Sequence, residues 1–136
     1  MAAISLKNSP NSIIMNSDIN KIKFLPKQFD LIIALAVIHN FPPRELNILL
    51  INIKDWLKDD GFLIIDTTYH EKSTRGYYRK EDFPGKLLRY RQQWKREDLD
   101  KILFNNGFKI DHNFNSPFDE KNEQWLEYVL VKNDIK

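Results

Sequence analysis

The chain alternates continuous apolar runs with segments whose apolar residues recur at helical spacing. Residues 29–37 and 62–68 are apolar and contain β-branched side chains, which predicts strands buried on both faces of a sheet. Between these runs, leucines and isoleucines recur every three or four positions, which predicts an amphipathic helix over about 43–58. Prolines precede this helix, and we expect Gly61 to end it in a left-handed cap conformation.

Weaker patterns predict the remaining elements. A short apolar run at 12–16 predicts a strand, and 95–106 has the spacing of a helix with Gly107 as its C-terminal cap. Residues 108–114 and 125–131 predict two strands, and the turn-rich segment between them suits an antiparallel hairpin.

This order of elements favours one domain of the α/β class over residues 1–136. We expect a mainly parallel sheet with helices on its faces and an antiparallel strand pair at its C-terminal end. The absence of cysteine excludes disulfides and thiolate chemistry, and the three histidines show no metal-ligand spacing. No run is long enough to cross a bilayer and no signal peptide is visible, so the cytoplasm is the expected compartment.

Glycine and charge are distributed unevenly. The chain has four glycines, and no two are close enough to form a phosphate-binding loop. Residues 72–96 contain nine basic side chains and two acidic ones. Most of them belong to a basic and aromatic insert over about 69–94, whose secondary structure the pattern leaves open. This insert is typical of a solvated lid, of a grip on a small anionic substrate, or of RNA binding by phosphate contacts and stacking.

Several short motifs occur together in a characteristic order. They are residues 16–19 (NSDI), 29–33 (FDLII), 37–40 (VIHN), 57–61 (LKDDG) and the pattern of Trp94, Leu99, Leu103, Gly107 and Phe108. In this order and spacing, the chain from about Ser12 to Lys132 resembles the C-terminal part of the class I S-adenosylmethionine-dependent methyltransferases.

The resemblance implies a truncated Rossmann-like sheet. In the family, the strands lie in the order third, second, first, fourth, fifth, seventh, sixth, and the first strand is followed by a glycine-rich cofactor loop. The chain has no counterpart of the first two strands, so the strand at 29–37 would have an unpaired apolar edge. We expect this edge to be covered by the segment 12–16, by a second copy of the chain, or by a complementary chain.

The resemblance also assigns cofactor contacts for S-adenosylmethionine. Asp18 and Ile19 match the family's adenine site, where a carboxylate accepts a hydrogen bond from the adenine amino group. Ala34, Leu35 and Ala36 end the fourth strand, where small residues leave space for the sulfonium. A turn role for Asp18 and plain core packing for Ala34 to Ala36 are the alternatives.

Catalytic and substrate-binding candidates follow these strands. His39 and Tyr69 come directly after the two central strands and would serve as a base if the reaction needs one. Tyr77, Tyr78 and Arg75 lie in the insert, which in the family often builds the substrate lid. A lone histidine such as His39 is also common as a packed structural residue.

The sequence therefore predicts a methyltransferase-like domain that acts on a small molecule and is incomplete alone. Whether it is an enzyme stays open, because the glycine-rich loop is missing. A non-catalytic subunit or dimerising remnant is the first alternative, and an RNA-associated module that uses the basic insert is the second. The small overall charge of +2 argues against a dedicated nucleic-acid binder.

Overall fold

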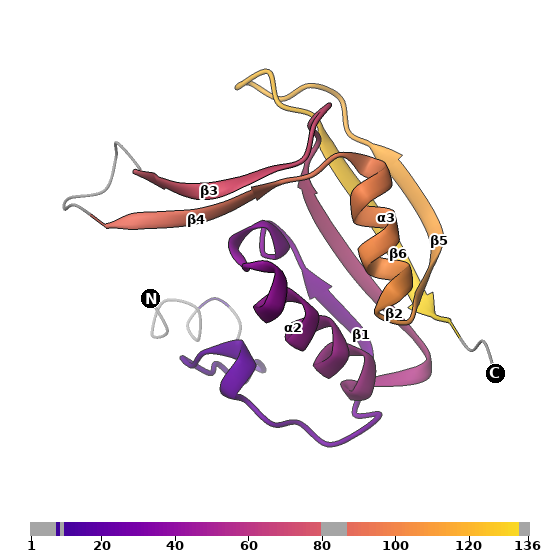
Figure 1. Cartoon of the computed structure of the whole chain (residues 1–136). Coiled ribbons are helices and arrows are strands. Elements are labelled where there is room, and N and C mark those ends of the chain that lie inside the picture. Colours follow the sequence, from indigo (N-terminus) through magenta and orange to yellow (C-terminus); the bar gives the residue numbers. More distant parts are fainter. Residues whose placement is uncertain (1–7, 9, 80–86, 134–136) are drawn as a thin grey trace.

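The computed structural model describes Asn8 and residues 10–79 and 87–133 (Figure 1). Its main sheet has the strand order β1-β2-β6-β5. The four strands are β1 (Phe29–Ala34), β2 (Leu57–Thr68), β5 (Phe108–Asn115) and β6 (Trp125–Lys132). This is the predicted order of fourth, fifth, seventh and sixth strands, so the predicted arrangement of the main sheet is confirmed.

The directions of the strands match the expectation only in part. β1 and β2 pair in parallel, whereas β6 pairs antiparallel with both β2 and β5. Three strands therefore run one way, but only one of the three pairings is parallel, and the sheet is mixed rather than mainly parallel. The reason is that β6 lies between β2 and β5 and runs opposite to both, so both of its pairings are antiparallel.

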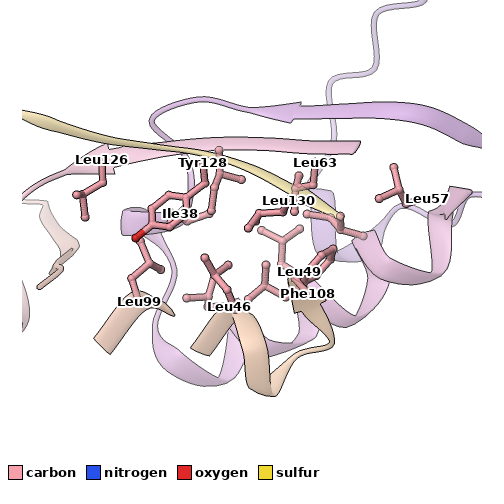
Figure 2. Close-up of a cluster of buried hydrophobic side chains, with 14 of the residues drawn as sticks. Ile38, Leu46, Leu49, Leu57, Leu63, Leu99, Phe108, Leu126, Tyr128 and Leu130 are labelled. Carbon is pink, nitrogen blue, oxygen red and sulfur yellow. The ribbon is translucent and has the colours of Figure 1, made fainter. Parts of the chain in front are cut away.

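Two helices, α2 (Pro43–Trp56) and α3 (Arg96–Asn105), pack on the same face of this sheet. Figure 2 shows their leucines meeting side chains that point from β2 and β6. The buried cluster is formed mainly by Leu46, Leu49, Leu50, Ile53, Leu63, Ile65, Leu99, Leu103, Leu126, Tyr128 and Leu130. Within the described residues no helix covers the other face, so the expectation of helices on both faces is not met.

The predicted strand at 12–16 does not form. These residues have no regular secondary structure, and Ile13 is 90% exposed. A single 3-10 turn, η1 (Ile19–Lys21), follows them and is capped by Asp18. The physical reason is that an apolar run becomes a strand only beside another strand, and none lies beside it here.

The boundary between α2 and β2 also differs from the prediction. α2 ends at Trp56, and fully buried Leu57 already begins β2 in extended conformation. Gly61 lies inside β2 rather than in a helix cap. A Cβ at this position would lie 2.9 Å from the backbone oxygen of Asp30 on β1, so close approach of two strands is what requires the glycine.

The cap at the end of α3 is as predicted. Gly107 has a φ of +88°, and its backbone N–H donates to the Phe104 oxygen at 3.0 Å. Glycine adopts this left-handed conformation without steric cost, which lets the chain turn directly from α3 into β5.

The basic insert forms a hairpin arm. β3 (Thr74–Arg79) and β4 (Leu88–Gln93) pair only with each other, as a separate two-stranded sheet that extends over the end of α2 (Figure 1). Residues 80–86 of the insert lie outside the described residues.

The close approach at Gly61 gives a direct test of the fold. Gly61→Ala should lower the free energy of unfolding by about 1–3 kcal/mol, because the new methyl group collides with the Asp30 oxygen and the Leu57 side chain. Gly76→Ala is the matched control, since a Cβ there meets only the Tyr78 ring at 3.6 Å. Urea unfolding of both variants measures the difference, and equal stabilities would contradict this assignment of Gly61.

Candidate functional site

A sharp turn closes the carboxyl end of β1. Ala36 has a φ of +56°, which is unfavourable for an alanine, and its backbone N–H donates to the Asp66 carboxylate on β2 at 2.5 Å. The Asn40 amide donates to the Ala36 oxygen at 3.1 Å. Of the predicted sulfonium residues, only Ala34 is therefore in the strand, while Leu35 and Ala36 form the turn. A charged hydrogen bond holds this strained turn against the neighbouring strand.

His39 lies directly beyond this turn, in the 3-10 turn η2 (Ile38–Asn40). Its ring is only 2% exposed, and Nδ1 lies 3.1 Å from the Thr67 hydroxyl. Burial, together with the positive charges of Arg91 and Arg89, lowers the pKa of His39 to about 4. The imidazole is therefore neutral at pH 7 and is a weak base.

Tyr69 follows β2 at the point where the hairpin arm leaves the main sheet. Its backbone N–H donates to the Gln124 oxygen at 2.7 Å, and it forms an isolated bridge with Trp94. The half-buried ring packs against the core. Because β1 and β2 are parallel neighbours, His39 after β1 and Tyr69 after β2 lie at the same edge of the sheet.

An apolar groove of about 410 Å³ runs along the free edge of β1. Its lining includes Ile19, Ala34 and Val37, together with Trp56 at the far end of α2. Asp18 is exposed beside it, and its carboxylate accepts from the Asn20 backbone N–H at 3.0 Å as the cap of η1. The structure therefore brings together Ile19 and Ala34, two predicted cofactor contacts that are distant in sequence.

The hairpin arm separates the three predicted substrate residues. Arg75 and Tyr77 share one face with Tyr90, whose ring meets Tyr77 edge-on at 5.5 Å. Tyr78 lies on the opposite face, because side chains alternate along a strand. That second face also carries Arg89 and Arg91, whose side chains make hydrogen bonds from the arm to η2 and β2.

Five polar residues at this edge were not among the sequence candidates. Asp66, Thr67 and Asn40 hold the turn and His39, and Arg89 and Arg91 reach the edge from β4. Arg89 donates to the Asn40 side-chain oxygen at 3.1 Å, and Arg91 donates to the Thr68 hydroxyl at 3.3 Å. The available signals were the polar residues that end β2 and the alternation of arginines in the insert.

Two other kinds of site were searched for within the described residues. No group of three or more histidine, aspartate or glutamate side chains is arranged to hold a metal ion. None of the helices in that part of the chain has the length and apolar character needed to span a membrane.

The chain is similar to known proteins in sequence and in fold. Residues 1–65 match a family model described as a methyltransferase domain. No curated protein matches the sequence. Among solved structures, the Burkholderia thailandensis 1,6-didemethyltoxoflavin-N1-methyltransferase, with bound 1,6-didemethyltoxoflavin and S-adenosylhomocysteine, superposes with a TM-score of 0.80 at 15% identity.

Two further methyltransferase structures are similar. An S-adenosylmethionine-dependent methyltransferase from Clostridium acetobutylicum has a TM-score of 0.71 at 15% identity, and a putative one from Listeria monocytogenes has 0.74 at 12%. The matches cover 98%, 97% and 97% of this chain but 56%, 70% and 76% of those proteins. The resemblance seen in the sequence is thus confirmed, and the chain spans little more than half of the first of these structures.

Asp66 and Ala36 are joined by the hydrogen bond of the strained turn, and substitutions at these two residues should change the stability of the chain in opposite directions. Asp66→Ala should destabilise the chain by about 1.5–3 kcal/mol, because the Ala36 N–H loses a charged acceptor. Ala36→Gly should instead be neutral or stabilising, by up to about 1 kcal/mol, because glycine accepts the positive φ. Thermal unfolding of the two variants tests this, and a loss of stability in Ala36→Gly would contradict it.

Buried His39 predicts a pH dependence of stability. Its pKa is lower in the folded chain than in the unfolded chain, so stability is complete above pH 6.5 and falls as the pH drops from 6.5 to about 4. The contribution is up to about 3 kcal/mol. Denaturant unfolding between these pH values should show a smaller loss for His39→Gln than for the wild type, and equal losses would exclude His39 as the cause.

Proposed function

Because the chain has the fold of the class I S-adenosylmethionine-dependent methyltransferases, we propose that it binds S-adenosylmethionine at the carboxyl edge of β1 and β2. The methyl acceptor would be a small molecule held under the hairpin arm. The observation that carries this proposal is the groove at the β1 edge, where Ile19 and Ala34 meet. The resemblance assigns Ile19 to the adenine and Ala34 to the sulfonium, which are the two ends of the adenosyl part of the cofactor.

The groove suits the adenine part of the cofactor. Its volume of about 410 Å³ lies in the usual range for small-molecule sites, and its walls are apolar. The Asp18 carboxylate beside it can accept a hydrogen bond from the adenine amino group. None of the described glycines lines the groove, so the chain supplies no glycine-rich cradle for the methionine part.

When bound, S-adenosylmethionine supplies an electrophilic methyl group. The work of the chain is then to align the acceptor and to exclude water. Ala34 leaves space at the end of β1, and the turn at Ala36 is held rigid by Asp66. His39, neutral and fixed by Thr67, orients the acceptor. If the acceptor loses a proton in the reaction, Tyr69, directly after β2, is the second candidate besides His39 to receive it.

The proposal includes a partner that covers β1. On the uncovered face of the sheet, Leu31, Ile33 and Phe62 are 47%, 56% and 43% exposed, and Leu31 lies opposite Phe62 in the register. Within the described residues, the outer edge of β1 has no paired strand. A second copy of the chain or a complementary chain would bury this surface and provide the rest of the cofactor site.

The same exposed edge favours a second candidate function. A non-catalytic methyltransferase-like subunit would use β1 and its apolar face only as a protein interface. It would associate with its partner without any affinity for the cofactor. Measurements of cofactor binding and of association with a partner therefore distinguish the methyltransferase from the non-catalytic subunit.

The first test is calorimetric titration of the 136-residue chain with S-adenosylhomocysteine, with its mass in solution measured in parallel. We expect binding that Asp18→Ser weakens about tenfold, because serine keeps the cap of η1 but removes the carboxylate. Asp60→Ser, an exposed carboxylate in the first half of β2, is the control and should bind like the wild type.

Absence of binding, alone and with the complementary partner, would overturn the enzymatic proposal. Stable association without cofactor affinity would then support the non-catalytic subunit. Equal binding by the Asp18→Ser variant and the wild type would remove Asp18 from the adenine site.

A further inference from the structure

Two arginines of the hairpin arm point toward the candidate site. Arg89 and Arg91 alternate along β4, so their side chains share one face. They stand opposite Tyr78 and Gly76 in the register of the hairpin. This is the face from which the arm contacts η2 and the end of β2.

Each guanidinium is anchored by a single neutral contact. Arg89 donates to the Asn40 side-chain oxygen, and Arg91 donates to the Thr68 hydroxyl. A guanidinium carries five N–H donors, so most of the donors on each side chain are not used by these contacts. Neither arginine forms an ion pair with a carboxylate in the described ranges 10–79 and 87–133.

A hollow of about 220 Å³ lies between these side chains. It is lined by Tyr78, Arg79, Arg89 and Arg91. The hollow therefore brings the Tyr78 phenol beside the guanidinium groups of Arg89 and Arg91, which share its face, with Arg79 at the end of β3 next to them.

The positive field of this face reaches the adjacent buried groups. After burial, the charge of Arg91 is the next cause that lowers the pKa of both His39 and His70. The charge of Arg91 therefore acts on the two histidines closest to the end of β2, buried His39 and partly buried His70. Among the described residues, no carboxylate forms an ion pair with either arginine, and the positive potential of this face favours an anionic ligand.

We propose that Arg89 and Arg91 bind an oxyanion, a carboxylate or a phosphate, on the methyl acceptor. This inference rests on the proposed function and narrows its substrate class to small acids. The planar guanidinium fork matches the oxygens of either group in a bidentate pair. The Asn40 and Thr68 contacts hold the forks at the carboxyl edge, so the bound acid would extend from the arm toward Ala34 and His39.

RNA is the less favourable ligand for this face. The Tyr77 and Tyr90 rings pack edge-on against each other on the opposite side of the hairpin, away from the arginine pair. Binding to single-stranded RNA would need open aromatic faces beside the positive charges. Among the described residues of β3 and β4, Tyr78 is the one aromatic side chain on the face of Arg89 and Arg91.

The test is titration of the full chain with inorganic phosphate and with malonate, followed by calorimetry and by the NMR signals of the arginine Nε–H groups. We expect Arg89→Gln and Arg91→Gln each to weaken binding about tenfold, because a hydrogen bond between charged groups is lost. Lys101→Gln on α3 removes the same charge from an exposed position and should bind like the wild type. Tighter phosphate binding would identify a phosphorylated acceptor, and tighter malonate binding a carboxylic acid.

Three results would overturn the inference. These are no binding of either anion, equal binding by the arginine variants and the wild type, and tighter, steeply salt-dependent binding of an RNA oligonucleotide. Titration of the wild-type chain with S-adenosylhomocysteine keeps the two proposals separate. Anion binding that needs the arginines but occurs in a chain without cofactor affinity would preserve this site and reject the proposed function.

Discussion

The structure depends on the burial of one face of β2. Leu63 and Ile65 lie between β1 and β6 and beneath both helices, and they are fully buried. Four other elements are placed by this strand: β1 and β6 pair with it, and α2 and α3 cover it. Because side chains alternate, the same strand presents Phe62 and Ile64 to the opposite face, where no described element packs on them. One strand thus defines both the closed core and the open surface.

The site inherits its geometry from the end of this strand. β2 enters the core at Leu57 and reaches the carboxyl edge at Asp66, Thr67 and Thr68. These three polar side chains hold, in turn, the Ala36 backbone, His39 and Arg91. Side chains on the core side of β2 supply the hydrophobic stabilisation, and the polar end supplies contacts to three separate segments. The resemblance gives Ala36 and His39 separate roles, but both residues are held in place by the same strand.

The apolar runs at 29–37 and 62–68 identified two strands of the main sheet, and the order of its strands was predictable only from the resemblance to the family. The segment 12–16 has the same composition but lacks a neighbour, and a local pattern does not report on neighbours. The start of β2 is the opposite case, because its residues form a strand although they are polar. Its Asp59 is polar because it is exposed and pairs with Lys27 and Lys132, so the strand has no apolar signature there. The face that carries Arg89 and Arg91 could not be predicted without the register of the hairpin, which depends on how β3 and β4 pair rather than on composition.

The hairpin arm leaves the domain at Tyr69 and returns at Trp94, and these two residues bridge each other. Its strands form a separate sheet, and the buried cluster of β2, β6 and the helices includes only Trp94 from its return. Mutations along β3 and β4 can therefore accumulate with little cost to folding. The arm can therefore vary separately from the domain: changes in β3 and β4 would alter what lies against the carboxyl end of β2 while the main sheet and its core stay unchanged.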